Sequence, residues 1–272
     1  MTIAPPPFLN ESIKSLVDIP ATLSSLIATV RAQPADQQSR MFLFQMLCVD
    51  GQWEKAHAQV RALALAQLSP EAQMLATAYG QTIAGEGARA ACFAGRGKAS
   101  LLVDPHGWAS DLVAAIEAEA AGDIARGVQL RSDAFDRCPP ISGTIDGRPF
   151  GALFDGDMRF GPTLEAIVAS RWGLIPFSAV EEIVTAGPVD LCDLVWLPAE
   201  IRFREGGALA AMLPVRYPDV ERETDADLRL ARRTEWRETP YAVHGAGQRM
   251  WTTDAGDDVG ILSFRRIAFV RP

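Results

Sequence analysis

Apolar side chains in the first half of the chain recur at helical spacing. Met41, Phe44 and Cys48 follow one another at intervals of three and four residues, which places them on one face of a helix. Alanine-rich stretches at 56–68 and 112–121 also favour helices, because alanine has the highest helix propensity. The pattern predicts that residues 9–138 are entirely α-helical.

Turn residues divide this helical half at a nearly constant interval. Gly51 and Gly85 are 34 residues apart, each with an alanine five residues later, Gly122 follows after a further 37, and a weaker copy lies at Val17. Prolines that end or begin helices accompany these marks at positions 34, 70, 105 and 139. The segment 50–56 resembles the turn of a tetratricopeptide repeat, so the interval predicts stacked helix pairs with a concave surface for a peptide or helix. An irregular helical domain without true repeats is the alternative.

The second half has a different pattern. Glycine, proline and short apolar runs at 139–150 predict a linker into a new domain that covers residues 151–272. There the spacing at 162–170 predicts a helix that begins near Pro162. Three apolar runs separated by glycine turns predict strands, at 191–197, 208–213 and 261–270. Short strands with one or two helices indicate an α+β domain, so the fold class of the whole chain is predicted to be α+β.

Composition limits the kinds of partner. Of the 272 residues 48% are hydrophobic and 22% charged, which are values of a globular protein. The net charge of −8 argues against binding to nucleic acid or to an anionic membrane, since either needs a basic face. The start of the chain, predicted to be disordered over residues 1–8, lacks the features of a signal peptide, and no apolar run is long enough for membrane insertion. The four cysteines have no metal-binding spacing, so a cytoplasmic protein with reduced thiols is expected.

Asp155 and Asp157 are the strongest candidates for catalytic chemistry. Two carboxylates at this spacing can hold Mg²⁺ or Mn²⁺ against a nucleotide diphosphate, with Glu165, Asp190 and Asp193 further along the chain. The simpler interpretation is a turn, where aspartate bonds to the backbone, and no nucleotide-binding unit precedes the pair.

Other motifs are incomplete. The glycines at 95–98 lack the remaining residues of a phosphate-binding loop, and those at 245–249 do not open an apolar helix. The three histidines, His57, His106 and His244, have no nucleophile motif beside them. We therefore predict no catalytic, cofactor-binding or metal-binding residues.

Apolar and tryptophan-containing blocks remain without a catalytic explanation. They lie at 157–165, 172–177, 193–199, 213–218, 234–236 and 245–249, and further blocks lie at 30–36, 40–48 and 51–56. In this order and spacing they resemble the ImpE/TagJ family, also called SciE-type proteins, which are accessory proteins of bacterial type VI secretion systems. The resemblance covers nearly the whole chain.

The resemblance implies a non-enzymatic adaptor without cofactor or metal. It implies binding to the small subunit of the contractile sheath and to ClpV, the AAA+ ATPase that recycles contracted sheaths, with self-association as a further alternative. The aromatic residues that could anchor a partner are Phe42, Phe44, Trp53, Trp172, Trp196 and Trp236. Core packing is the favoured interpretation of the first three and remains an alternative for the others. Arg216 and Arg249 are expected to be structural ion-pair partners.

Two other functions stay open. One is a metal-dependent transferase that uses Asp155 and Asp157, and the other is a repeat scaffold outside secretion.

Overall fold

The computed structural model describes residues 18–67, 69–103 and 107–270. The predicted disordered segment at residues 1–8, the proline at position 105 and the histidine at position 106 lie outside the described residues. Helices occupy the first part of the described chain and strands the second, which confirms the predicted α+β class.

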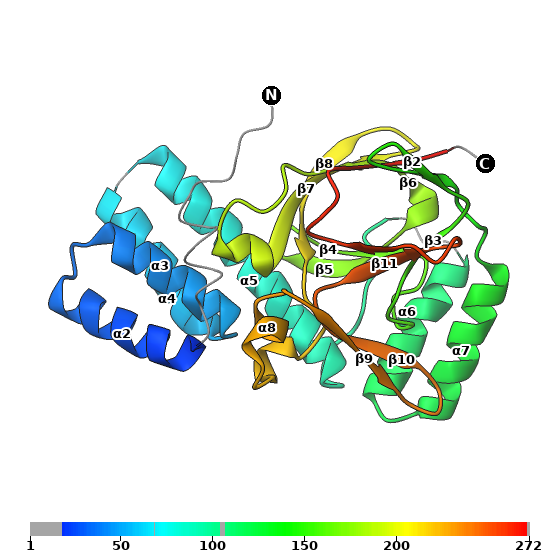
Figure 1. The fold of residues 1–272 in the computed structure, drawn as a ribbon, viewed down its shortest axis with the longest axis horizontal. Coiled ribbons are helices and arrows are strands. Elements are labelled where there is room, and N and C mark those ends of the chain that lie inside the picture. The colour runs from blue at the N-terminus through cyan, green and yellow to red at the C-terminus, as the bar shows by residue number, and fades with distance from the viewer. Residues whose placement is uncertain (1–17, 68, 104–106, 271–272) are drawn as a thin grey trace.

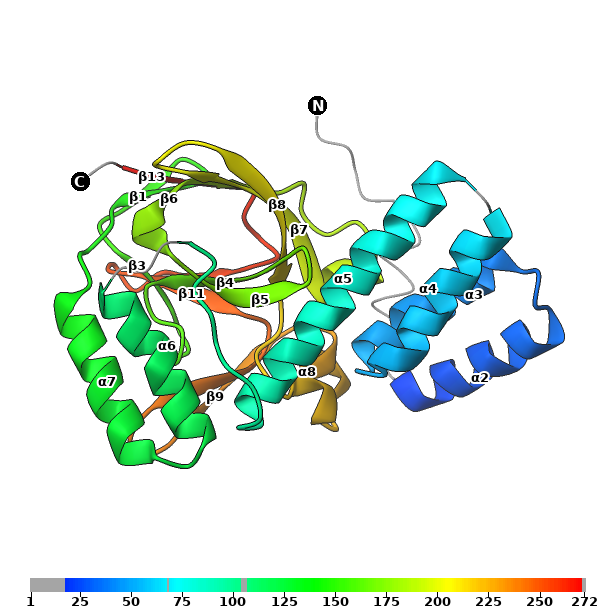
Figure 2. The same cartoon turned by 180° about the vertical axis from the view of Figure 1, so that it is seen from behind.

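Six helices precede the first strand, counted over the described residues. They are α2 (Ile19–Ala32), α3 (Gln37–Val49), α4 (Trp53–Gln67), α5 (Pro70–Phe93), α6 (Gly107–Ala120) and α7 (Ile124–Arg137). Polar side chains cap their starts: Asp18, Asp36, Ser69 and Asp123 each accept a hydrogen bond from the first turn of the following helix. Helices α2, α3 and α4 lie at one end of the molecule and α6 and α7 at the other, while α5 leads from the first group along the sheet (Figures 1 and 2).

The glycine marks of the predicted repeat divide into two groups. As predicted, Gly51 and Gly122 lie in the turns between α3 and α4 and between α6 and α7. Both have positive φ. The turn predicted at Gly85 is wrong, because α5 continues through this residue. A Cβ at Gly85 would overlap the side chain of Ile167 in the sheet, so glycine here allows the helix to approach the sheet closely.

Every strand pair of the second part is antiparallel. An eight-stranded sheet has the order β2-β1-β13-β6-β7-β8-β4-β5, and two smaller sheets have the orders β10-β9 and β12-β11-β3. The strands are β1 (Gly143–Ile145), β2 (Arg148–Phe150), β3 (Leu153–Asp155), β4 (Thr163–Val168), β5 (Arg171–Pro176), β6 (Val180–Val184), β7 (Trp196–Phe203), β8 (Ala208–Pro214), β9 (Thr234–Glu238), β10 (Val243–Gly247), β11 (Met250–Thr253), β12 (Asp258–Gly260) and β13 (Arg266–Phe269). Short helical turns are η1 (Phe177–Ala179), η2 (Leu191–Leu194), η3 (Val220–Arg222) and α8 (Ala226–Arg229).

Several predicted elements differ from this arrangement. The helix predicted at 162–170 is strand β4, whose residues are buried on both faces and include the β-branched Thr163, Ile167 and Val168. The strand predicted at 191–197 begins only at Trp196, because Asp190 caps the short helix η2 instead. The strand predicted at 208–213 is β8, and that predicted at 261–270 is limited to β13. The segment predicted as a linker, 139–150, contributes β1 and β2 to the large sheet.

The apolar core joins the two parts of the chain. One cluster of buried side chains combines residues of α2–α7, such as Phe44 and Leu112, with sheet residues such as Trp172 and Trp196. A second cluster fills the interior of the curved sheet, around Phe177, Leu213 and Trp251. The helices therefore share a core with the sheet.

Candidate functional site

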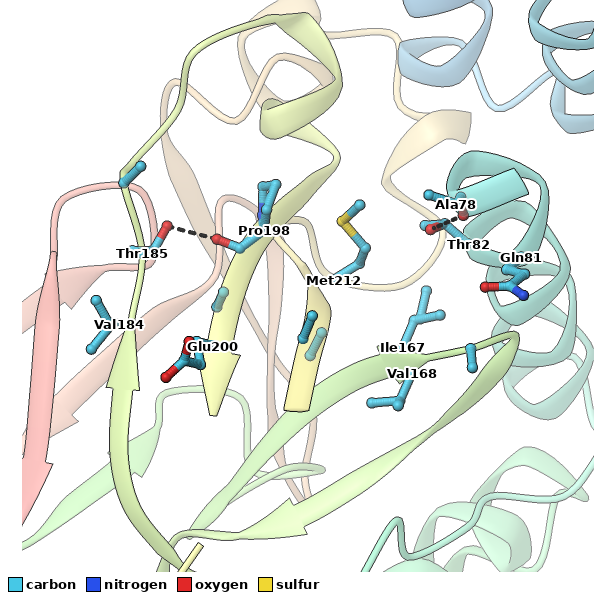
Figure 3. Close-up of a pocket in the computed structure, with 15 residues that line it drawn as sticks. Ala78, Gln81, Thr82, Ile167, Val168, Val184, Thr185, Pro198, Glu200 and Met212 are labelled. Carbon is cyan, nitrogen blue, oxygen red and sulfur yellow. Dashed lines mark hydrogen bonds between the residues drawn. The ribbon is translucent and has the colours of Figure 1, made fainter. Parts of the chain in front are cut away.

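A groove runs between α5 and the outer face of the sheet (Figure 3). We call it the main groove. It encloses about 550 Å³, and its lining is mostly small and apolar: Ala78, Gln81, Thr82, Ile167, Val168, Ala169, Val184, Thr185, Ala186, Pro198, Ala199, Glu200, Ala210, Ala211 and Met212. This size suits several apolar side chains of a partner.

Strand alternation produces the floor of the main groove. In β7 and β8, the inward residues such as Leu197 and Leu213 are fully buried in the sheet core. The outward residues oppose one another in pairs, Pro198 with Met212 and Glu200 with Ala210. Because Ala210 is small, a partner can approach the sheet closely at this point.

Hydrogen bonds keep the polar groups of the walls occupied. The Thr185 hydroxyl donates to the Pro198 carbonyl over 2.8 Å, and the Thr82 hydroxyl donates to the Ala78 carbonyl over 2.8 Å (Figure 3). Both walls therefore present mainly carbon to the groove, with Val184 37% exposed on the sheet side.

A smaller hollow adjoins the main groove between α4 and α5. This side compartment encloses about 400 Å³ and is lined by His57, Arg61, Ala76, Thr77, Gly80, Gln81, Ala84 and Ser170. Gln81 lines both hollows, and the β4–β5 turn at Ala169 and Ser170 contributes one residue to each. Both turn residues have positive φ, 44° and 69°, which is costly for residues other than glycine. Backbone strain is thus located where the two hollows meet.

Buried ion pairs fix α5 against the sheet. Arg89 of α5 donates to both carboxylate oxygens of Glu165 in β4, over 2.7 and 3.1 Å, and to Glu86 over 2.9 Å. Two tryptophan indoles donate to the same carboxylates, Trp172 to Glu165 over 2.6 Å and Trp196 to Glu86 over 2.8 Å. Since these groups are desolvated and mutually satisfied, the wall formed by α5 is held in one position.

Arg249 extends this network to the candidate metal residue Asp155. Its guanidinium, completely buried, bonds to Asp155 and Glu165 and lies 4.3 Å from the ring centre of Phe160. The Tyr217 hydroxyl donates to Asp155 over 3.0 Å. Burial raises the pKa of Asp155 to about 6, although Arg249 acts in the opposite direction. The expected role of Arg249 as an ion-pair partner is thereby shown.

Asp157 is similarly occupied. Arg159 donates to its carboxylate from Nε over 2.9 Å, and the Gly245 amide donates over 2.9 Å. Burial acts to raise the pKa of Asp157, but Arg159 and these hydrogen bonds outweigh it, so the pKa lies below its usual value. Among the residues that the structure describes, no cluster of three or more metal-binding side chains exists. The geometry of Asp155 and Asp157 is that of structural carboxylates.

Arg216 has a different role from the expected ion pair. Its guanidinium donates to the carbonyls of Val49, at the end of α3, and Arg229, at the end of α8, over 2.9 and 2.7 Å. Helix C-termini leave such carbonyls without partners and carry partial negative charge. Burial lowers the pKa of Arg216 to about 10. Arg216, two residues after β8, thus links the ends of α3 and α8.

The candidate anchor residues lie mainly in the core. Phe44 is fully buried, and Trp53 packs on Trp196 with ring centres 5.3 Å apart. Trp172 and Trp196 serve as buried donors, and Trp236, 40% exposed, lies on the β9–β10 hairpin. Only His57 among the described histidines lines either hollow, while His244 lies in β10.

Sequence reasoning missed most of this site. The groove residues come from α5, β4, β6, β7, β8 and the segments that follow β4 and β6, and they carry no motif. The sequence interpretation places Glu86 and Arg89 beside a repeat turn, and Glu165, the partner of Arg89 in the sheet, is 76 residues from it. A signal existed only in the i, i+3 spacing of Glu86 and Arg89 on a helix.

Comparisons with known proteins identify a matching family, a related sequence and a similar structure. The sequence profile described as ImpE protein matches residues 147–268. The type VI secretion system accessory component TagJ of Pseudomonas aeruginosa is 38% identical over 247 residues, which cover 91% of this chain and 86% of that protein. A crystal structure of protein VPA1032 from Vibrio parahaemolyticus has a TM-score of 0.82 at 21% identity, covers 93% of this chain and 94% of that one, and so shows a common fold.

Proposed function

Because the chain belongs to the ImpE/TagJ family of type VI secretion accessory proteins, we propose that it is a non-enzymatic adaptor of the secretion machinery in the cytoplasm. Its partner would be the small sheath subunit, the ClpV ATPase, or both. The main groove is the observation that carries this proposal, since it is apolar, preformed and held open by a buried ionic network.

A short amphipathic helix is the segment that best fits the main groove. Helix α5 already covers one part of the outer sheet face, and the neighbouring part with Val184, Pro198, Ala210 and Met212 is uncovered. A partner helix beside α5 would extend the helical layer over the sheet, which is how sheet faces are commonly buried. No described helix is both long and apolar enough to cross a membrane.

Peptide binding tests this function. Overlapping fluorescent peptides that cover the small sheath subunit and ClpV would be titrated with the protein and followed by anisotropy. At least one peptide is expected to bind, and A210D should weaken that binding by about tenfold or more, because it places a charge in the apolar floor.

A208D is the matched control. Ala208 lies two residues away on the same exposed side of β8 but does not line the groove, so its substitution should leave affinity unchanged. Binding that is equally insensitive to A208D and A210D would place the partner elsewhere. Absence of binding to every peptide, and to both whole partners, would overturn the proposed function.

A further inference from the structure

The side compartment has a cationic wall that no described carboxylate neutralises. Arg61 and His57 are four residues apart on α4 and face the hollow together. Arg61 is exposed and forms no hydrogen bond or ion pair within the described part of the chain. None of the described residues that line this compartment is acidic.

The opposite wall of the side compartment, formed by α5, leaves space beside His57 for a chemical group of a ligand. Gly80 of α5 faces His57, and a Cβ at Gly80 would lie 3.1 Å from the imidazole Nε2. Thr77 and Gln81 complete this side of the hollow. A larger residue than glycine at this position would crowd the imidazole of His57.

The main groove differs from the side compartment in that no cationic residue is among the described residues of its lining. Among the described residues, Glu200 is the only charged one in its lining, and it accepts a hydrogen bond from Arg202 over 3.0 Å. Because Gln81 lines both hollows, a continuous surface leads from an apolar groove to the guanidinium of Arg61. A segment that occupies the surface would meet positive charge at one end only.

We infer that the side compartment is a carboxylate-recognising subsite that fixes the direction of a bound partner segment. The occupant is an amphipathic helical segment whose apolar side chains fill the main groove and whose Asp or Glu at one end bonds to Arg61 and His57. This inference rests on the proposed function only in taking the main groove as a docking surface. The chemistry of the occupant follows from charge complementarity.

Selection from a random peptide library tests the subsite without knowledge of the partner. Phage-displayed 16-residue peptides would be selected on wild-type protein, on R61E and on the control R96E. Arg96 is also exposed but follows the far end of α5. Wild type and R96E should select apolar peptides with an acidic residue at a fixed offset, and R61E should select a basic residue there. A synthetic selected peptide should bind R61A about threefold to tenfold more weakly than wild type at low salt.

The outcomes separate this inference from the proposed function. A common apolar motif without any charge preference, identical on wild type and R61E, would overturn the subsite and leave the groove intact. Selection of no apolar motif would overturn both the subsite and the docking surface. A charge-dependent motif that is absent from the sheath subunit and ClpV would support the subsite and contradict the proposed partners.

Discussion

Arg249 bridges two carboxylates in a place that water does not reach. Its side chain and those of Asp155 and Glu165 are fully buried. Buried ions that are paired on all sides add little net stability, but the loss of one partner leaves an uncompensated charge in a medium of low dielectric. Arg249 therefore matters because it compensates the buried negative charges of Asp155 and Glu165.

Substitution of Arg249 should be severe. R249M is expected to lower the free energy of unfolding by about 3–5 kcal/mol, measured by urea denaturation. R202M removes an arginine whose side chain is 56% exposed and also pairs with two carboxylates, and should cost at most about 1 kcal/mol. Addition of D155N to R249M should recover part of the lost stability, because it removes the carboxylate charge whose ion pair R249M deletes, whereas Glu165 keeps its ion pair with Arg89. Equal effects of R249M and R202M would contradict this account.

Asp155 also predicts a pH dependence. Its pKa in the folded protein is about 6, above its value of about 4 in an unfolded chain, so the folded state binds the proton more tightly. Stability should therefore rise through this group as the pH falls from 7 to 5. Relative to D155N, wild type should gain about 1 kcal/mol over this interval.

The comparison isolates Asp155 from other groups. Asp193, whose pKa burial also raises to about 6, is present in both proteins and cancels. Asp157 and Glu165 have lowered pKa values, so their contributions are lost only at more acidic pH. Urea denaturation at pH 7 and pH 5 measures the difference, and a constant difference would show that Asp155 does not titrate in this range.

At the scale of elements, local signals predicted helices better than strands. The α3–α4 turn followed from Gly51, which adopts the positive φ of 74° that favours glycine. Strand β4 was mistaken for a helix because Leu164, Ile167 and Val168 have helical spacing, and a short apolar run fits either element. Its partners β5 and β8 decide the outcome, and pairing with β8 joins residues far apart in sequence, Ile167 and Met212.

Two glycines of α5 test how the helix meets the sheet. Gly85 faces Ile167, a β-branched side chain with little freedom to move, whereas a Cβ at Gly87 would have no neighbour within 4 Å. G87A should stabilise the protein by about 1 kcal/mol through helix propensity. G85A gains the same propensity but overpacks the contact, and should destabilise by about 1–3 kcal/mol.

Thermal denaturation followed by circular dichroism compares the two variants. The expected order of midpoints is G87A above wild type and wild type above G85A. If both substitutions raised the midpoint, α5 would not be held closely against β4.

At the scale of the whole molecule, the sequence was informative about class and family but not about the site. Each of the two ion pairs around Glu165 joins residues about 80 positions apart, 76 for Arg89 and 84 for Arg249. The main groove forms where α5 meets strands β4, β6, β7 and β8, which are far apart along the chain. Neither arrangement has a local sequence pattern, since both depend on tertiary packing.

The shared core makes a prediction about cooperativity. The sequence predicts separate domains before and after residues 139–150, whereas Phe44, Trp172 and Trp196 lie in one apolar cluster. In addition, Arg89 of α5 bonds to Glu165 of β4, and Arg216 bonds to the end of α3. Removal of either part would expose this cluster and leave the buried charged side chains of α5 without their partners.

We therefore expect a single unfolding transition in urea, with helix content from circular dichroism and tryptophan fluorescence changing at the same midpoint. A separately expressed fragment 18–138 should lack a cooperative transition. Two distinct midpoints, together with a cooperatively folding fragment, would instead establish the helical half as an independent domain.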